Sequence, residues 1–210
     1  PWFKNGKETE LPEDFYSSEF FVDQMIEFIE EDKQMDSPFF AYLSFQAQHI
    51  PLQAPQEFID KYLTTYEEGW DILREQRKNK AVEKGIFPPD KKIVDSMSTL
   101  DSWSALDQES KKMIIKSMAV FAGMLDAMDF HIGRFITYLK KEGLYENTIF
   151  IVTADNGPEG NDPSDHAPWR EWFKTTIYDR DYETLGDQDS YVYIGTEFAQ
   201  AMASPSHLFK

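Results

Sequence analysis

The spacing of apolar residues predicts two helices in the first half of the chain. Residues 17–33 start at Ser17, a favourable N-cap, and carry their apolar side chains on one stripe. Residues 56–80 also have a helical composition, with an interruption near Gly69, because glycine is a poor helix former. The acidic residues of the first segment are expected to form its solvated face.

A longer helix is predicted to start near residues 107–108 and to end with Gly143 as its C′ residue. Its apolar residues recur at spacings of three and four, which indicates a buried face rather than a cofactor site. The residues of this face are Met118, Phe121, Leu125, Met128, Ile132, Phe135 and Leu139. Asp126, Asp129 and His131 suggest a metal cluster, but no third well-placed ligand accompanies the two aspartates, which favours a structural role.

Two short apolar runs have the composition of buried parallel strands. Residues 39–45 (FFAYLSF) and 148–152 (TIFIV) are rich in aromatic and branched side chains, and polar or proline-containing segments bound them. Residues 1–16 are predicted to be an irregular lead-in, and residues 91–107 a polar, irregular surface segment. The two runs are therefore the candidate strands of the fold.

Polar side chains follow both runs, at the point where each strand is expected to end. Asp155 and Asn156 come after the second run, and His49 comes after the first. Carboxylate and carboxamide oxygens suit Ca²⁺ or Mg²⁺, and imidazole transfers protons near neutral pH. Because open α/β sheets bind ligands at the carboxyl ends of their strands, these residues are expected to face one anion pocket. The alternatives are a simple Asn156-Gly157 turn and an ordinary loop histidine.

Taken together, four segments resemble the sulfatase family, with type I arylsulfatases as the nearest relatives. They are FFAYLSFQAQHIPLQAPQEFIDKY at 39–62, the GWD and REQR stretch within 66–89, the segment ending in TADNGPEG at 118–160, and AQA with SPSHLFK within 199–210. The resemblance implies an alkaline-phosphatase-like α/β fold, in which helices flank a mostly parallel sheet. Residues 1–210 would be the central portion of a sulfatase catalytic domain, with a divergent excursion at about 161–196.

The resemblance also implies an activity, metal-dependent hydrolysis of sulfate esters, and roles for the matching positions. Asp155 and Asn156 would ligate the cation, commonly Ca²⁺, with Mg²⁺ as the alternative. His49 would contact the sulfate and assist proton transfer at the leaving or bridging oxygen. Lys210 would bind a sulfate oxygen. Two other hypotheses stay open: a non-catalytic sulfatase-like fragment or scaffold, and a phosphodiester or phosphonate hydrolase of the same superfamily.

The chain does not contain the nucleophile motif of the family, which is Cys/Ser-x-Pro-x-Arg matured to formylglycine. It has no cysteine, and no serine stands in a Ser-x-Pro-x-Arg context. The paired N-terminal aspartates of the family are also absent, so formylglycine and further metal ligands are expected in an N-terminal part outside this chain. We therefore expect the 210-residue chain alone to have negligible sulfatase activity and weak metal affinity.

The charge of the chain narrows the class of its partners. With 38 acidic residues against 21 lysines and arginines, the formal net charge is −17, which argues against nucleic acid and anionic membranes. A sulfate-ester small molecule or a sulfated carbohydrate would need local positive charge from the metal, His49 and Lys210. The remainder of the same polypeptide is a further candidate partner. No apolar run is long enough to predict a membrane span, and the resemblance to exported bacterial sulfatases implies a periplasmic or secreted location.

Aromatic residues raise two further questions. Tyr66 and Trp70 are expected to be core or lid aromatics rather than a sugar-binding platform. In the excursion at 161–196, four aromatic residues either line a substrate entrance or pack an ordered loop: Trp169, Trp172, Tyr178 and Tyr182. His166 would contact substrate if this loop folds over the pocket.

Overall fold

The computed structural model of the chain describes most of its residues. These are residues 1–32, 37–93, 95, 102–162, 170–172, 181–206 and 208–209. The chain divides into two compact units, each treated by itself below. The first unit comprises residues 1–47 and 127–150, and the second comprises residues 48–126 and 151–210.

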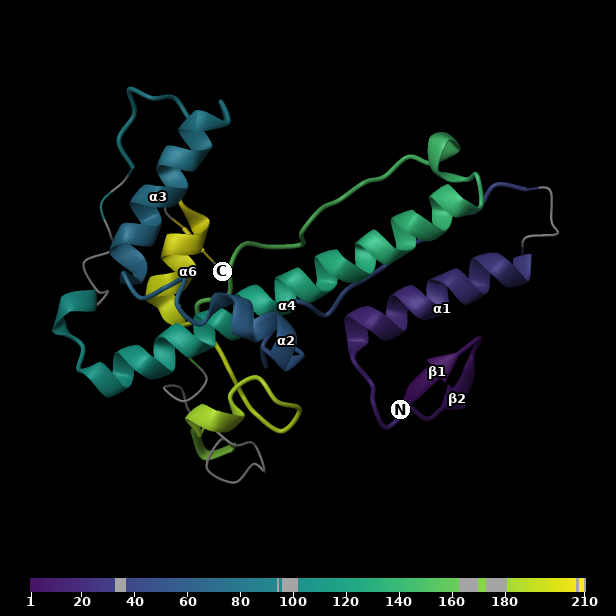
Figure 1. Ribbon diagram of the computed structural model, residues 1–210, viewed down its shortest axis with the longest axis horizontal. Coiled ribbons are helices and arrows are strands. Elements are labelled where there is room, and N and C mark those ends of the chain that lie inside the picture. Colours follow the sequence, from purple (N-terminus) through teal and green to yellow (C-terminus); the bar gives the residue numbers. More distant parts are fainter. Residues whose placement is uncertain are drawn as a thin grey trace. The chain divides into compact units, whose positions relative to one another are not determined.

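Helices dominate the part of the chain that the structure describes (Figure 1). They are α1 (Ser17–Asp32), α2 (Gln56–Ile59), α3 (Gly69–Glu83), α4 (Gln108–Lys141) and α6 (Gly195–Ala203). Short 3₁₀ helices lie at Asp60–Tyr62, Trp103–Ala105, Tyr145–Asn147 and Tyr182–Thr184, and the strands are β1 (Trp2–Lys4) and β2 (Lys7–Thr9). Among the described residues, no helix combines the length and the apolar character needed to cross a bilayer.

Strands β1 and β2 form an antiparallel hairpin in the first unit. Asn5 and Gly6, which connect them, both have positive φ angles of 52° and 74°. A two-residue type I′ turn requires this conformation, and Asn-Gly is its strongest sequence signal. The prediction that residues 1–16 are irregular is therefore wrong for this hairpin, because Asn5-Gly6 is a hairpin turn signal.

Helix α1 and the second half of α4 form the core of the first unit. Val22 and Ile29 of α1 are buried together with Phe135 and Leu139 of α4. Leu43 and Phe45, which belong to the first apolar run, are partly buried against this cluster: the run contributes alternate side chains to it. The predicted helix from residue 17 is confirmed, with its last residue at Asp32.

Both ends of α4 are capped, and the cap at the second end is the one that the sequence predicts. At the start, the Ser110 backbone N–H donates to Asp107 Oδ1 at 2.8 Å, which is an N-cap bond. At the end, Gly143 has a φ of +71°, and the Leu144 N–H donates to the Leu139 carbonyl at 2.9 Å. This bond and the left-handed glycine define a Schellman motif, so the helix stops where Gly143 predicted.

The predicted buried face of α4 is correct at its two ends and wrong in the middle. Four of the predicted positions are buried: Met118, Phe121, Phe135 and Leu139. Leu125, however, is 40% exposed, and Met124 and Ala127 are buried in its place. The reason is that α4 is enclosed around Gly123, where a Cβ would come within 2.9 Å of the Ile59 backbone nitrogen. Contact with α2 therefore selects a face that the apolar spacing alone does not identify.

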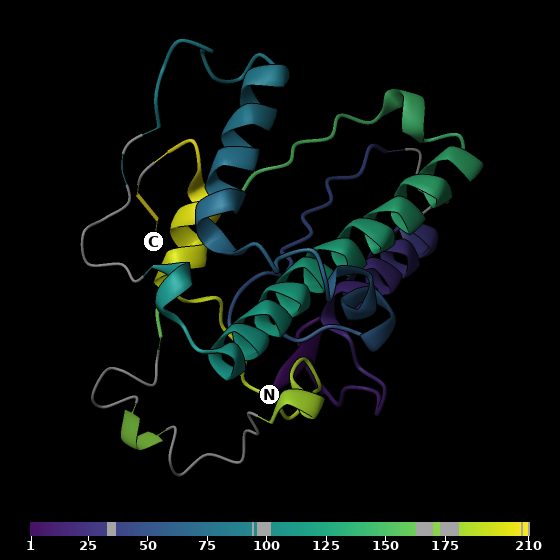
Figure 2. The ribbon, with the colours of Figure 1, turned by 60° about the vertical axis from the view of Figure 1, so that its left-hand side comes forward.

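Helices α3 and α6 lie side by side in the second unit (Figures 1 and 2). Phe198 of α6 is fully buried and meets the rings of Trp70 and Tyr66 edge-on, at centroid distances of 5.5 and 6.0 Å. Gly69 begins α3 with a φ of +79°, and the ring of Trp103 covers its Cα. The break near Gly69 and the core position of Trp70, which is 5% exposed, are as predicted.

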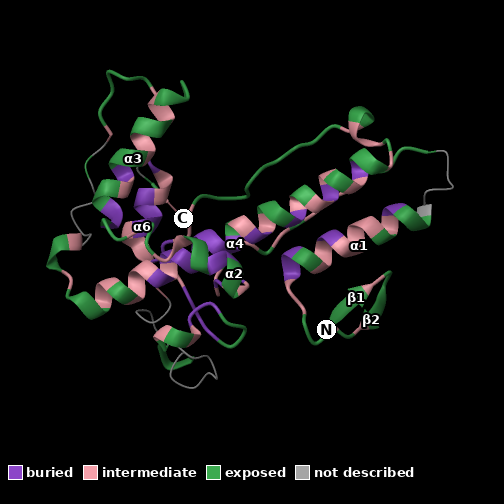
Figure 3. Cartoon of the chain, viewed as in Figure 1, coloured by how far each residue is buried: buried purple, intermediate pink, exposed green. Residues whose placement is uncertain are grey.

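The two apolar runs do not form strands. Residues 39–45 and 148–152 have no regular structure, and the described residues contain one sheet, the β1–β2 hairpin. Phe40 and Val152 are each 92% exposed and Ile151 is 86% exposed (Figure 3). The strands that both runs predict are therefore not seen in the described residues. A strand buries its side chains only when neighbouring strands and helices cover it. Here the first run is partly covered at Leu43 and Phe45, whereas residues 149–152 are exposed.

Candidate functional site

His49 lies in an exposed turn just after the first apolar run. Its Nδ1 is 2.6 Å from the carbonyl oxygen of Ile50. A carbonyl oxygen only accepts hydrogen bonds, so Nδ1 carries a hydrogen and donates a hydrogen bond to the Ile50 carbonyl. The local backbone therefore engages Nδ1 of His49 rather than Nε2.

The segment that follows His49 is held by backbone hydrogen bonds to a distant part of the chain. The Leu52 N–H donates to the Val192 carbonyl at 2.9 Å, and the Ala54 N–H donates to the Gly186 carbonyl at 3.1 Å. Leu52 is 1% exposed, so this attachment lies in the interior. The His49 turn is therefore exposed, while the segment that directly follows it is held in the interior.

Asp155 and Asn156 lie in an exposed bend after the second apolar run. The Asn156 side-chain nitrogen donates to the Gly157 carbonyl at 2.7 Å, which leaves its Oδ1 as an acceptor for a cation. Both side chains have the oxygen chemistry of Ca²⁺ or Mg²⁺ ligands. Ca²⁺ takes roughly six to eight oxygens, however, and the described residues contain no group of three or more His, Cys, Asp or Glu side chains placed to hold a metal. The pair fits a hard cation but does not complete a site.

The loop that follows the Asp-Asn pair is attached at two points to the C-terminal part of the chain. The Tyr193 hydroxyl donates to Asp162 Oδ2 at 2.8 Å. Gly160 is buried beneath the ring of Phe209, where an added Cβ would lie 2.5 Å from Cε2. Lys210, the predicted sulfate-binding residue, follows Phe209 in the sequence and lies outside the described residues.

Two adjacent residues of one segment thus support both predicted loops. Val192 accepts a hydrogen bond from the His49 segment, and Tyr193 donates one to the loop after Asn156. The sequence analysis missed this support. The bond between Leu52 and Val192 joins residues more than a hundred positions apart, and the bond between Tyr193 and Asp162 joins residues 31 positions apart. No local sequence pattern could therefore reveal them. His49 and Asp155 belong to no common metal-ligand group in the described part of the chain.

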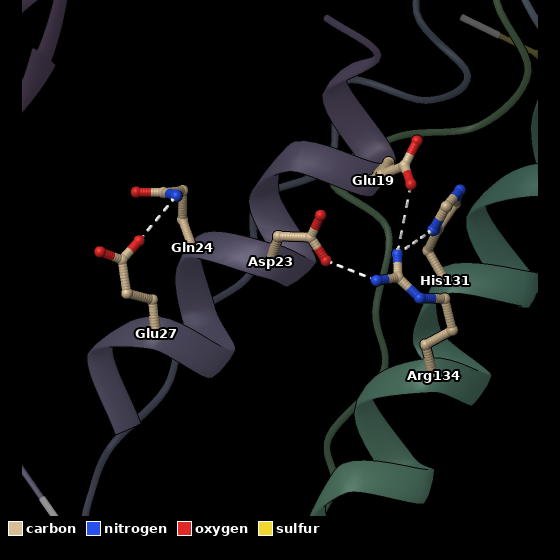
Figure 4. A network of polar contacts seen from close by, with 6 residues as sticks. All are labelled: Glu19, Asp23, Gln24, Glu27, His131 and Arg134. Carbon is tan, nitrogen blue, oxygen red and sulfur yellow. Dashed lines mark hydrogen bonds and ion pairs between the residues drawn. The ribbon is translucent and has the colours of Figure 1, made fainter. Parts of the chain in front are cut away.

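A polar network in the first unit accounts for His131 (Figure 4). Arg134 donates to Asp23 at 2.6 Å and lies 3.7 Å from a carboxylate oxygen of Glu19. Its Nη1 is also 2.9 Å from His131 Nδ1. Because arginine only donates, that nitrogen accepts and the imidazole is neutral. Burial lowers the pKa of His131, against the opposing effect of the Glu19 carboxylate.

The alternative metal cluster on α4 is not formed. Asp126 makes an ion pair with Lys61 at 2.8 Å, and His131 is bonded to Arg134. Asp129 is exposed, and it belongs to no candidate ligand group among the described residues. An ion pair accounts for Asp126 and a hydrogen bond accounts for His131.

Part of the excursion at 161–196 is packed on the scaffold. Leu185 and Val192 are buried, and the Tyr182 ring lies 3.9 Å from the Lys112 ammonium of α4. Trp172 is 41% exposed and contacts the Tyr191 ring at a centroid distance of 6.0 Å. Three residues of the predicted entrance lie outside the described residues: His166, Trp169 and Tyr178. For Tyr182, the ordered packing that the sequence analysis left open is thus observed.

Comparisons with known proteins agree with the resemblance. The Sulfatase family model matches residues 1–189. The chain is 38% identical over 198 residues to an uncharacterized sulfatase of Schizosaccharomyces pombe, which covers 93% of the chain and 35% of that protein. It is 33% identical over 202 residues to an arylsulfatase of Klebsiella aerogenes, which covers 96% of the chain and 43% of that protein. The chain belongs to the sulfatase family.

The chain is also similar to a more distant relative from the alkaline phosphatase superfamily. The chain is 25% identical over 165 residues to a multifunctional alkaline phosphatase superfamily protein of Trinickia caryophylli, which covers 74% of the chain and 30% of that protein. Membership of the sulfatase family implies the alkaline-phosphatase-like α/β fold. The chain spans only 35% and 43% of the length of its two more similar relatives.

Proposed function

We propose that the whole protein carrying this chain hydrolyses sulfate esters, of which aryl sulfates are the simplest representatives. The match to the sulfatase family over residues 1–189 carries this proposal. The attachment of the His49 turn and of the loop after Asn156 to Val192 and Tyr193 supports it. Two loops anchored on adjacent residues are suited to present their side chains to one substrate.

His49 is the proposed proton-transfer residue. When the bond between sulfur and the ester oxygen breaks, the leaving oxygen gains negative charge and needs a proton. His49 supplies it from Nε2, while Nδ1 stays bonded to the Ile50 carbonyl. Lys210 is proposed to bind a sulfate oxygen as a positive charge. The nucleophile, a formylglycine formed from cysteine or serine, is proposed to lie outside these 210 residues, which contain no cysteine.

Asp155 and Asn156 are the proposed ligands of a divalent cation, Ca²⁺ or Mg²⁺. A bound cation would stabilise negative charge that develops on the sulfate oxygens. Its remaining ligands would come from outside the described residues, because Asp155 and Asn156 supply at most two carboxylate oxygens and one amide oxygen. Since the net charge of the chain is −17, this local positive charge is what makes the pocket attractive to an anion.

The exposed apolar runs fit the same proposal. Residues 39–45 and 148–152 would become strands of a mostly parallel sheet when they pair with other parts of the polypeptide. The exposure of Phe40, Ile151 and Val152 supports this, because large apolar surfaces on a folded chain mark sites that another surface covers. In this proposal residues 1–210 are the central portion of the catalytic domain, and the protein is periplasmic or secreted.

Turnover of two substrates by the complete protein tests the function. We expect 4-nitrophenyl sulfate to be hydrolysed with a higher kcat/KM than bis(4-nitrophenyl) phosphate, and His49→Ala to lower kcat without loss of folding. Faster phosphodiester turnover would favour the alternative of a phosphodiester or phosphonate hydrolase. Absence of both activities, together with no Cys/Ser-x-Pro-x-Arg motif in the complete sequence, would leave the non-catalytic alternative.

A further inference from the structure

Three consecutive residues, 52–54, bind backbone carbonyl groups at alternate positions of a distant segment. The two outer residues donate from their backbone N–H groups. The middle residue, Gln53, donates from its side chain: Nε2 lies 2.6 Å from the Gln188 carbonyl oxygen and 2.9 Å from that of Ser190. A glutamine carboxamide has two N–H donors, so one side chain serves both acceptors. We call the four carbonyl groups, at residues 186, 188, 190 and 192, the carbonyl row.

The start of the carbonyl row is attached to helix α4. Lys116 of α4 is 5% exposed, and its Nζ donates to the carbonyls of Tyr182 and Glu183 at 2.6 and 3.2 Å. Gly186 has a φ of +103°, and an added Cβ there would lie 2.9 Å from Cγ2 of Val120, also in α4. A buried ammonium and a close backbone contact thus hold this part of the row against a long helix.

A fully buried hydroxyl holds the carbonyl row from within. Ser190 Oγ accepts a hydrogen bond from the Gly186 N–H at 2.8 Å and donates one to the Asp187 carbonyl at 2.9 Å. The Ser190 N–H donates to the same carbonyl at 3.0 Å. These bonds fix the relative positions of the acceptors that Gln53 binds.

The His49 turn depends on this attachment for its place in the molecule. The hydrogen bond of the His49 ring goes to its own neighbour, Ile50, and does not attach the ring to the rest of the fold. Among the described residues, the first backbone bond from this stretch to a distant segment is that of the Leu52 N–H. Gln53 is four residues from His49, and each step between Cα atoms spans about 3.8 Å, so a loosened anchor is transmitted over a short stretch of chain.

We infer that Gln53 is a positioning residue for the proton transfer that we propose for His49. The inference rests on that proposed role. The N–H groups of its two neighbours bind the ends of the carbonyl row, and Gln53 binds the two acceptors between them. Loss of the carboxamide removes two of the four attachments and gives the His49 turn more freedom. Misplacing a group that acts on substrate by about 1 Å can lower activity up to about a hundredfold.

A misplaced proton donor has a kinetic signature that depends on the leaving group. A general acid contributes most when the leaving oxygen is strongly basic, because that oxygen most needs the proton. Phenol is a more basic leaving group than 4-nitrophenol. A misplaced His49 therefore slows the hydrolysis of phenyl sulfate more than that of 4-nitrophenyl sulfate, whereas a smaller amount of folded protein slows both by the same factor.

The test is steady-state kinetics of the complete protein with these two esters. Gln53→Met keeps the length of the side chain and removes both N–H donors. It is expected to lower kcat about tenfold for phenyl sulfate and about twofold for 4-nitrophenyl sulfate, with KM within about twofold of the wild type. Ser190→Ala loosens the carbonyl row instead of the glutamine, and it is expected to change the ratio of the two kcat values in the same direction by a smaller factor.

A matched control and a double-mutant cycle accompany the test. Gln76→Met in α3 removes a carboxamide that donates to Glu68 at 3.1 Å on the exposed surface, and its kinetics are expected to be unchanged. His49→Ala is the reference for the loss of the proton donor. In the His49→Ala background, Gln53→Met is expected to cause no further change in kcat, because the group that it positions is gone.

The outcomes separate the inference from the proposed function. If Gln53→Met slows both esters by the same factor, or slows them as much in the His49→Ala background, the positioning role is wrong and the proposed function stands. If Gln53→Met does not fold, Ser190→Ala decides: an unchanged ratio of the two kcat values refutes the role. If His49→Ala leaves phenyl sulfate turnover unchanged, the proposed role of His49 and this inference are both wrong. If the wild-type protein hydrolyses neither ester, the proposed function itself is wrong.

Discussion

Helix α4 and the apolar run at 148–152 are separated by only residues 142–147, yet they differ in what they need to fold. Helix α4 satisfies its backbone hydrogen bonds internally and has its own caps at Asp107 and Gly143. The apolar run is richer in apolar residues than α4 but is almost fully exposed at Ile149, Ile151 and Val152. The comparison shows that apolar composition produces burial only where backbone partners are also present.

The largest expected effect comes from a matched pair of leucines on α4. Leu139 is fully buried in the first unit, whereas Leu125 is 40% exposed. Leu139→Ala is expected to lower the free energy of unfolding by about 2–5 kcal/mol, because it leaves a cavity. Leu125→Ala is expected to change it by less than about 1 kcal/mol. Urea unfolding of the 210-residue chain, followed by circular dichroism, measures both values. Equal effects would mean that α4 buries a different face.

The same substitution in two contexts tests the apolar run. Ile151 is 86% exposed, so Ile151→Ala is expected to change the unfolding free energy of the chain alone by less than about 0.5 kcal/mol. In the complete protein, where we propose that this run is a buried strand, the same change is expected to lower it by about 2–5 kcal/mol. Ile29→Ala, at a residue 9% exposed, should destabilise both forms and serves as the control. A negligible effect of Ile151→Ala in the complete protein would refute the proposed strand.

Two glycines, one inside α4 and one just after its end, should respond to alanine with opposite signs. Gly143 has a φ of +71°, so Gly143→Ala places a side chain in a strained conformation and is expected to destabilise α4 by about 1 kcal/mol. Gly133 lies inside the helix with nothing within 4 Å of an added Cβ, and Gly133→Ala is expected to stabilise it by about 0.5–1 kcal/mol. Thermal unfolding of the two variants beside the wild type measures both shifts. A change of the same sign in both would contradict the Schellman ending.

The smallest expected effect is a pH dependence from His131. The groups that face it are Glu19, Asp23 and Arg134, with the Tyr16 ring nearby. Burial lowers the pKa of His131 in the folded state. At a pH of about 6.5 and somewhat below, the unfolded chain therefore binds more protons at this residue than the folded chain does. Stability from His131 is therefore fully present above that pH and is lost as the pH falls through the lowered pKa.

Urea midpoints at pH 5.5 and 7.5 measure this dependence. The midpoint of the wild type is expected to be lower at pH 5.5, and His131→Gln, which keeps an acceptor for Arg134 but does not titrate, should reduce the difference. The other histidines of the chain are present in both proteins and cancel in the comparison. An identical difference in the variant would show that His131 does not contribute.

Local patterns predicted the candidate side chains better than they predicted the site. Polar residues directly after apolar runs pointed to His49, Asp155 and Asn156, and their roles stay predictions. The hairpin at Asn5 and Gly6 had a clear turn signal and could have been predicted. The anchors on Val192 and Tyr193 could not, because each bond joins segments that are remote in the sequence.

The amino-acid sequence alone determined the helices α1 and α4, the glycine that ends α4, and membership of the sulfatase family. These depend on interactions within a few residues or on motifs that can be read along the chain. Only the tertiary structure decided that Ile149, Ile151 and Val152 stay exposed, that α2 selects the buried face of α4, and that Phe209 lies on Gly160. Each of these depends on a partner far along the chain. A helix carries its hydrogen-bond partners within itself, whereas a strand or a loop acquires them only from the rest of the fold.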